Sequence, residues 1–535
     1  MALDKQTQIY TQPAMEQQTP SVAVSVRSER AGYSRSGQPA RCLASLRATD
    51  AIPPERTPLD LVLVIDKSGS MAGSKMQLTK ETANLVAKEL SAIDRLSIIT
   101  YDSHVECAMP LSKMDAHGKS VAAEAISSIR PGSTTNLSGG LMRGLEEVHA
   151  PENPAETTSV LLMTDGLANN GICDTKALTA CIESILAARS TPCTIFTFGY
   201  GADHNAEMLR SISDCGGGQY YHMENGDAVA SSFADCIGGL LSVVAQNVRL
   251  HLHASPSTSV KVLSQGYKTS TDAATGTVEI NLGDIYSEEN KDILFEVELP
   301  AGDGTTNVTA SLSYLDVLRT ELVASQHAHI TLVRANETSV EADIQVVEQA
   351  NRVETVIAIK RANELAFTGH CPEGRQVLEE TMQRLKLSPG AKDSSLTTKL
   401  IADLAECQGG MQDRSFTGSE WCRQQCVMQS HSRQRQSHCT PTRALAEGKE
   451  AWSSDSPYDT KSKRSMRSKW TPSAASPSVS APLVAQDSTS VPASTGAVAG
   501  GAVAEPCSRR VEHCSAEGFV VVDTPKPPVH VCALD

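Results

Sequence analysis

The stretch LDLVLVIDKSGSM, residues 59–71, decides how the first half of the chain is interpreted. Six of its first seven residues are apolar, which predicts a strand buried on both faces of a sheet. The strand ends at Asp66, and the hydroxyls of Ser68 and Ser70 follow at alternate positions. Gly69 lies between them, and we expect it to let the loop turn tightly. An acid and two hydroxyls at the end of a buried strand indicate a polar site at that edge of the sheet.

Strand and helix patterns alternate from about residue 57 to residue 243. The strands are separated by segments with apolar residues at helical spacing, as in SKMQLTKETANLVAKELSAI, residues 74–93. This alternation predicts an α/β fold with a doubly wound, mostly parallel sheet that helices cover on both faces. The expected strands are LDLVLVID (59–66), DRLSIITYD (94–102), TTSVLLMTDG (157–166) and CTIFTFGYG (193–201).

Short stretches of alternating apolar and polar residues occupy residues 244–336 and predict a β-sandwich. The same alternation occurs earlier, in SVAVSVRSE and ARCLASLRA within residues 21–49. Two such strands alone would form a hairpin of marginal stability. We therefore expect the early strands to pack with the later ones, with the α/β domain inserted between the two halves.

Helical periodicity returns over residues 337–410 and predicts a helical hairpin or a three-helix unit. Residues 411–470 are then basic and residues 471–505 are rich in Ser, Pro and Ala, which predicts a largely disordered tail. The expected organisation is a flexible N-terminus (1–18), strands that pack with the later sandwich (19–56), the α/β domain (57–243), the β-sandwich (244–336), the helical unit (337–410) and the tail (411–535).

Three predicted loops carry oxygen donors at one edge of the α/β sheet, where ligands of open sheets bind. The donors are Asp66, Ser68 and Ser70 in the first loop, Thr135 in GSTTNL (132–137) and Asp165 at the end of LLMTDG (161–166). Thr134 is the less favoured alternative to Thr135. Two carboxylates and three hydroxyls, without sulfur or imidazole, favour Mg²⁺, with Mn²⁺ or Ca²⁺ as alternatives.

The Asp-x-Ser-x-Ser motif, followed by Thr135 and Asp165, resembles the metal-ion-dependent adhesion site of von Willebrand factor A domains. The resemblance covers about 185 residues and all five ligand positions. It implies a Rossmann-like sheet and a divalent cation with one coordination position left open. In this family a partner protein fills that position with an Asp or Glu carboxylate, so we expect a protein partner of that kind.

Two further resemblances carry less specific motifs. The segment from FGYGADHN to AQNVRL (198–250) is similar to the end of A domains in eukaryotic intracellular proteins, including plant proteins with a RING finger. No RING series of cysteines and histidines occurs here, so ligase activity is not implied. The helical region and SHSRQRQS (430–437) resemble the intein-associated segment that follows some A domains, without a self-splicing block.

Composition limits the class of partner and the compartment. A net charge of −15 disfavours nucleic acid or an anionic membrane as the partner, and 4% aromatic residues argue against a base-stacking surface. The first 18 residues lack the apolar core of a signal peptide, and no apolar run approaches the length of a membrane span. The 15 cysteines form no regular framework, so we expect reduced thiols and a cytoplasmic protein.

The expected function is a non-enzymatic, metal-dependent protein-interaction scaffold. No histidine lies in the three loops, so a general base for hydrolysis is missing. Two alternatives stay open, namely a RING-less component of a ubiquitin-ligase-type assembly and a secreted adhesion protein.

Weaker signals occur elsewhere in the chain. Asp102 and Asp94 are interpreted as structural acids, although Asp102 could orient the metal ligands. Cys532 in the final CALD lies where a prenylated cysteine would lie, and PKPP (525–528) could form a polyproline ligand. Both matches are attributed to chance. The segment WCRQQCVMQSHSRQRQSHC offers zinc-ligand types at an unusual spacing, and we interpret it first as a basic amphiphilic segment. Its candidate ligands are Cys422, Cys426, His431, His438 and Cys439.

Overall fold

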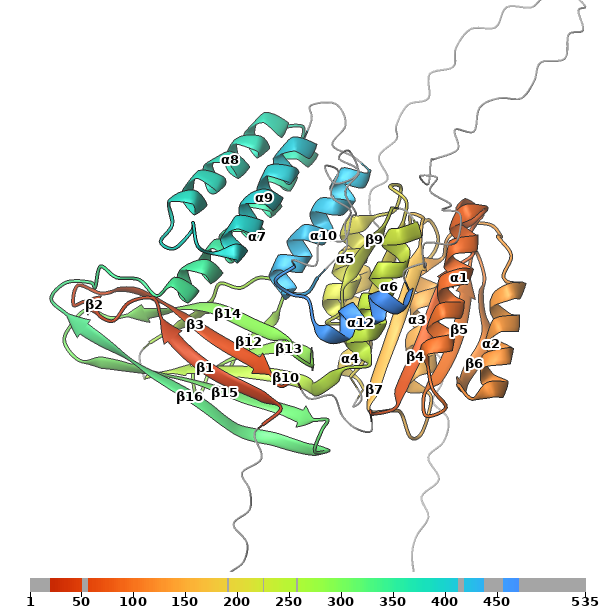
Figure 1. Ribbon diagram of the computed structural model, residues 1–535, viewed down its shortest axis with the longest axis horizontal. Helices are drawn as coiled ribbons and strands as arrows, with labels where there is room; N and C mark the ends of the chain where they lie inside the picture. The colour runs from red at the N-terminus through yellow and green to blue at the C-terminus, as the bar shows by residue number, and fades with distance from the viewer. Residues whose placement is uncertain are drawn as a thin grey trace, which may run out of the picture. The chain divides into compact units, whose positions relative to one another are not determined.

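Strand β4 (Leu59–Asp66) lies inside a six-stranded sheet of order β6–β5–β4–β7–β8–β9 in a computed structural model of the chain (Figure 1). Its neighbours β5 (Arg95–Tyr101) and β7 (Thr157–Thr164) pair with it in parallel, and β8 (Thr194–Tyr200) and β9 (Tyr220–Met223) continue the parallel order. At the edge, β6 (Val105–Lys113) is antiparallel to β5. The predicted mostly parallel α/β sheet is confirmed.

The structure describes residues 20–50, 56–189, 192–224, 226–255, 258–411, 418–436 and 456–470, all within one compact unit. The expectations for residues 1–18, His438, Cys439, the PKPP motif and Cys532 lie outside the described residues. Among the described helices, none is long and apolar enough to cross a bilayer.

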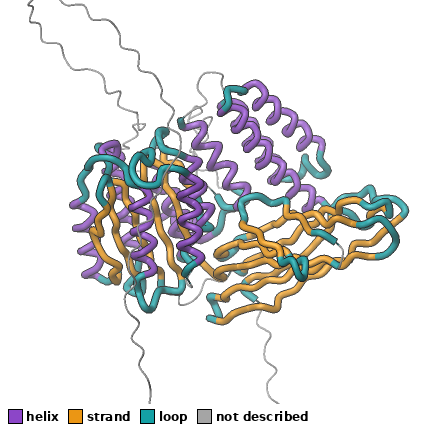
Figure 2. The backbone as a smooth tube through the Cα atoms, turned by 180° about the vertical axis from the view of Figure 1, so that it is seen from behind, coloured by secondary structure: helices purple, strands orange, loops and turns teal. Residues whose placement is uncertain are grey.

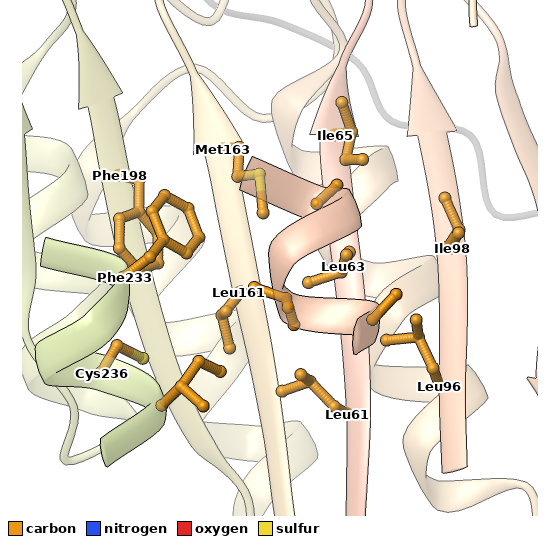
Figure 3. Close-up of a cluster of buried hydrophobic side chains, with 14 of the residues drawn as sticks. Leu61, Leu63, Ile65, Leu96, Ile98, Leu161, Met163, Phe198, Phe233 and Cys236 are labelled. Carbon is orange, nitrogen blue, oxygen red and sulfur yellow. The ribbon is translucent and has the colours of Figure 1, made fainter. Parts of the chain in front are cut away.

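Helices cover both faces of the α/β sheet (Figure 2), and β4 and β5 supply side chains to both faces. Leu61, Leu63 and Ile65 pack with one set of helices (Figure 3), whereas Val62 and Val64 pack with the other. The first set is α1 (Ser74–Glu89), α2 (Ala116–Ser128) and α6 (Gly226–Leu240). The second is α3 (Leu137–His149), α4 (Thr175–Ala187) and α5 (Ala206–Cys215). Each fully buried aliphatic side chain stabilises the sheet by about 1.5–3 kcal/mol, which explains the continuous apolar run.

Asp60 is the single acid within the apolar part of β4, and it is fully buried. Its two carboxylate oxygens accept hydrogen bonds from Nε and Nη2 of Arg95 at 2.7 and 2.6 Å. The backbone N–H of Ala155 donates a further bond of 2.7 Å to Oδ2. A two-pronged guanidinium contact of this kind satisfies the buried charge, so Asp60 is a structural acid.

Two further sheets share a second hydrophobic core. One has the order β1–β3–β14–β11 and the other β12–β13–β10–β15–β16–β2. Cys42 and Phe295 reach this core from the first sheet, and Leu250 and Ile280 reach it from the second. The strands are β1 (Val22–Ser28), β2 (Tyr33–Ser34), β3 (Gln38–Ala48), β10 (Val243–Ala254), β11 (Val260–Val262), β12 (Lys268–Thr271), β13 (Val278–Tyr286), β14 (Asn290–Leu299), β15 (Thr305–Asp316) and β16 (Glu321–Ala335).

The early strands pair directly with the later ones. β3 is antiparallel to β14 over its whole length, from Gln38 opposite Leu299 to Arg47 opposite Asn290. The α/β domain is therefore an insertion between β3 and β10. Both ends of the insertion are held by one turn, because the N–H of Glu288 donates to the carbonyl of Thr49 (2.9 Å) and that of Ser287 donates to Ser242 (2.7 Å).

Three helices, α7 (Ile344–Phe367), α8 (Cys371–Leu387) and α9 (Ser395–Gly410), pack around their own apolar core. The chain then departs from expectation, because α10 (Ser419–Arg433) and α12 (Lys461–Trp470) lie where we predicted a disordered tail. That prediction is wrong for residues 418–436 and 456–470.

Buried polar contacts explain why α10 looked like a solvated segment. Gln429 accepts a hydrogen bond from the Tyr220 N–H at 2.7 Å, which ties α10 to strand β9. Just beyond the helix, the buried Arg435 donates to Glu289 at 2.7 Å, between β13 and β14. A hydropathy pattern cannot distinguish such satisfied side chains from exposed ones.

Candidate metal centre

The carboxylate of Asp66 lies at the carboxyl end of β4 and is fully buried. Its Oδ1 accepts a hydrogen bond from the N–H of Ser68 at 2.7 Å, and its Oδ2 accepts one from the Thr164 hydroxyl at 2.6 Å. No cationic side chain pairs with this carboxylate among the described residues. Burial raises the pKa of Asp66 to about 6, and the nearby Asp165 adds to the rise although the two hydrogen bonds oppose it.

A short 3₁₀ helix, η1 (Gly69–Met71), carries the chain away from Asp66. The hydroxyls of Ser68 and Ser70 lie 3.1 Å apart, and Ser70 donates to Oδ1 of Asp165 at 2.8 Å. The chain turns tightly at Gly69, as expected, because Gly69 opens η1, and a positive φ occurs at Gly73 (+81°). A Cβ at Gly69 would meet the carbonyl oxygen of Gly132 at 3.4 Å, an ordinary contact distance.

Thr135 reaches the same place from the loop before α3. A Cβ added at Gly166 would lie 3.2 Å from the Thr135 hydroxyl and 3.7 Å from that of Ser70, so these two hydroxyls flank Gly166. Thr135 is buried, whereas Thr134, the less favoured alternative, is exposed. The structure thus brings together all five predicted residues, Asp66, Ser68, Ser70, Thr135 and Asp165, at one rim of the sheet.

Asp102 holds the loop that carries Thr135. Its carboxylate accepts hydrogen bonds from the N–H groups of His104 (2.8 Å) and Ser133 (3.3 Å). Burial alone would raise the pKa of Asp102. These two hydrogen bonds outweigh that effect, so the net shift of the pKa is downward. Gly132 leaves room for the acid, since a Cβ there would lie 1.9 Å from Oδ2. Asp102 thereby helps to position the loop that carries Thr135.

Asp94 lies at the opposite end of the sheet and is structural, as expected. Arg56 donates to both of its carboxylate oxygens, and the N–H of Ser91 donates a bond of 2.6 Å. Burial alone would raise the pKa of Asp94, but these hydrogen bonds and the Arg56 charge lower it overall.

Sequence reasoning missed two rim residues, Lys75 and Thr164. The ammonium group of Lys75 lies 2.5 Å from Oδ2 of Asp165, with 19% of the side chain exposed. A lysine in the first turn of a helix is unfavourable toward the helix dipole, which was a signal that it has an acidic partner. Thr164 directly precedes Asp165 and points back to Asp66, and its hydroxyl at the end of an apolar strand was a comparable signal.

The rim therefore fits a divalent cation. It gathers two buried carboxylates and three hydroxyls, all hard oxygen donors, against a single lysine. The ammonium group of Lys75 supplies a positive charge beside Asp165. Among the residues that the structure describes, Asp66 has no countercharge.

Comparison with known proteins identifies relatives of the domain that carries the rim. A family model described as von Willebrand factor type A domain matches residues 60–235. The chain is 29% identical over 253 residues to E3 ubiquitin-protein ligase WAV3 of Arabidopsis thaliana, a match that covers 46% of this chain and 32% of that protein. It is 27% identical over 261 residues to the uncharacterized protein YfbK of Escherichia coli, covering 48% and 44%. This chain thus spans about a third of the plant relative and less than half of the bacterial one.

Two solved structures share the fold. A von Willebrand factor type A protein from Catenulispora acidiphila superimposes with a TM-score of 0.60 at 17% identity, over 74% of this chain and 91% of that one. The ArnB paralog VWA2 from Sulfolobus acidocaldarius gives a TM-score of 0.53 at 16% identity, over 77% and 98%. The two structures show the same fold, and the family model identifies residues 60–235 of this chain as a von Willebrand factor type A domain.

Proposed function

We propose that the chain is a non-enzymatic interaction scaffold that captures a partner protein through a divalent cation at the rim. Asp66, Ser68, Ser70, Thr135 and Asp165 would hold the cation, with Mg²⁺ favoured and Mn²⁺ or Ca²⁺ as alternatives. The observation that carries the proposal is the buried Asp66 carboxylate without a cationic partner among the described residues. A bound divalent cation would supply that charge and act as a Lewis-acidic anchor for an Asp or Glu carboxylate of the partner.

The exposure of the five residues supports an approach from the Ser70 side. Asp66, Ser68, Thr135 and Asp165 are buried, whereas Ser70 is exposed. The buried members are held by hydrogen bonds from the surrounding loops, so the donors are organised before a partner arrives. The loops at residues 66–73, 130–136 and 165–171 contain no histidine, which supports a binding role over hydrolysis.

Capture in the presence and absence of metal tests the proposal. Proximity labelling with the wild-type chain and Asp66→Ala would identify partners that depend on the rim, and pull-downs with and without EDTA would follow them. We expect Asp66→Ala, Asp165→Ala and EDTA each to abolish capture while the fold is retained. Asp303→Ala, which removes a 78% exposed aspartate of the sandwich, is the matched control and should capture normally. Undiminished capture in EDTA would count against the mechanism.

A second candidate is a RING-less component of a ubiquitin-ligase-type assembly. Its support is that three plant relatives are named as ligases or a probable ligase, of which this chain spans 32–36%. A pull-down with purified ubiquitin-conjugating enzymes tests this candidate, and failure to retain any of them would count against it.

We further propose a cytoplasmic location rather than a secreted adhesion role. The cysteines that the structure describes carry free thiols, which supports a reducing compartment. Labelling of thiols in cell-extracted protein tests this, since disulfides among those residues would favour the secreted alternative.

A further inference from the structure

Three metal-binding side chains meet away from the rim, between the α/β domain and α10. His204 follows β8, His222 is on β9, and Cys422 is on α10. One ligand atom from each lies within 4.8 Å of those of the other two. All three side chains are buried, with exposed fractions of 5%, 1% and 1%. None of them belongs to the rim, and two come from segments that sequence reasoning did not connect with Cys422.

Hydrogen bonding does not explain why the imidazole of His222 is buried. Both of its ring nitrogens are buried without a hydrogen-bond partner, and Nδ1 of His204 is in the same condition. Leaving a buried polar atom unpaired costs about 1–3 kcal/mol, so three such atoms in one cluster require a reason. The Tyr220 hydroxyl (2.6 Å) and the Cys422 thiol (3.6 Å) account for Nε2 of His204 alone, and they leave His222 without a role.

The spacing of the donors suits zinc. Cys422 Sγ lies 3.6 Å from His204 Nε2. Zinc–nitrogen and zinc–sulfur bonds of about 2.05 and 2.3 Å at a tetrahedral angle separate nitrogen from sulfur by about 3.5 Å. The His204 ring can lie here because Gly199 of β8 has no Cβ. A Cβ at Gly199 would come within 2.3 Å of His204 Nε2.

The charges around the cluster also allow a cation. The guanidinium of Arg423, next to Cys422 in sequence, is paired with Glu224 and Glu420. Cys422 would bind as the thiolate and release its proton to solvent as the metal binds, with no change of oxidation state.

We propose that His204, His222 and Cys422 form a zinc site that fastens α10 to the α/β domain. Nitrogen and thiolate donors select zinc over the magnesium favoured at the rim. Three protein ligands would leave a fourth position open, and the Tyr220 hydroxyl, which hydrogen-bonds His204 Nε2 at 2.6 Å, would release that nitrogen to the metal. The site differs from the ligand set considered from sequence, because His431 binds Asp403 (2.9 Å) instead of joining Cys422.

Metal titration of the full chain tests the proposal. The chain is stripped of metal and titrated with Zn²⁺, and in parallel with Co²⁺, whose thiolate complexes absorb in the near ultraviolet. The Asp66→Ala background removes the rim as a competing site, so failure here is separate from failure of the proposed function. We expect a single zinc ion per chain in Asp66→Ala and a cobalt–thiolate band in both wild type and Asp66→Ala.

Ligand variants complete the experiment. Cys422→Ser and His222→Gln should weaken zinc binding by more than the roughly 10–100-fold that loss of an outer-shell partner costs. Cys193→Ser, which alters another buried cysteine before β8, is the matched control and should bind zinc like wild type. Circular dichroism identifies a variant that fails to fold. Absence of zinc uptake and of the cobalt band from the folded wild-type chain would overturn the proposal, as would an unchanged band in Cys422→Ser.

Discussion

The two ends of strand β4 carry two fully buried aspartates with opposite surroundings. Asp60 meets both prongs of the Arg95 guanidinium, whereas Asp66 meets only neutral donors from Ser68 and Thr164. Burying a charge is costly unless a countercharge compensates for it. The acid with its own cation stabilises the sheet. The acid without one weakens the sheet and would gain by binding a cation from solution, and this difference separates the structural end from the proposed binding end.

The largest effect is expected at Asp60. Asp60→Asn leaves the Arg95 guanidinium without its buried partner and should lower the free energy of unfolding by about 3 kcal/mol. Chemical denaturation measures the change. Asp66→Asn provides the contrast, and without metal it should be as stable as wild type to within about 1 kcal/mol. Equal losses in the two variants would refute the distinction between the ends.

Magnesium should stabilise the wild type through Asp66. At a free concentration 100 times the dissociation constant, binding to the folded chain alone adds about 2.7 kcal/mol. Thermal unfolding with magnesium and with EDTA measures the gain. Asp66→Asn should lose it entirely, and Asp60→Asn should keep it. A gain that survives in Asp66→Asn would place the cation elsewhere.

Asp94 extends the comparison to pH. Asp94→Asn removes charge-assisted hydrogen bonds from Arg56 and should cost about 2 kcal/mol at neutral pH. The folded-state pKa lies below the ordinary value of 3.8, so the folded chain binds this proton less readily than the unfolded chain. The stabilisation is therefore complete well above pH 3.8 and is lost as pH falls below it. Denaturation curves of both proteins should converge in acid, and a gap that persists would contradict the assignment.

The smallest effect concerns Lys75, which resembles Arg95 in chemistry but lies at the rim. Lys75→Met removes the ammonium that competes with metal for Asp165, so magnesium should bind about tenfold more tightly, or about 1.4 kcal/mol. Isothermal titration calorimetry measures the affinity. Lys67→Met is a suitable control, since its partner Glu106 lies on β6, outside the ligand set. Weaker binding in Lys75→Met would mean that this lysine supports the site.

Local spacing explains what could be predicted from sequence. Asp66, Ser68 and Ser70 lie within five consecutive residues, and the apolar period of the strands places Thr135 and Asp165 at the same rim. Alternation at residues 21–49 likewise indicated strands that join a later sheet, and β3 does pair with β14. In both cases short segments with regular periods were sufficient.

Contacts between distant segments explain what could not be predicted. The residues next to Asp60 and Lys75 in the sequence do not identify the partners of these side chains. The pairing depends on strand register and on the paths of the loops. Residues 418–436 were predicted to belong to a basic tail. In the structure, their buried glutamines and arginines find partners up to 219 residues away, and the segment itself does not reveal those partners. The likeness of residues 430–437 to the intein-associated segment stays a prediction.

The insertion of the α/β domain has a mechanical consequence. Its two ends leave from β3 and β10, each flanked on both sides by other strands of its sheet. Tension applied by a captured partner at the rim would divide between these two strands, which are anchored at the same Ser287–Glu288 turn. Each strand would be pulled along its hydrogen-bonded ladder, so many bonds would resist together instead of opening one after another. Two such attachments would share a load that a single flexible tether would concentrate.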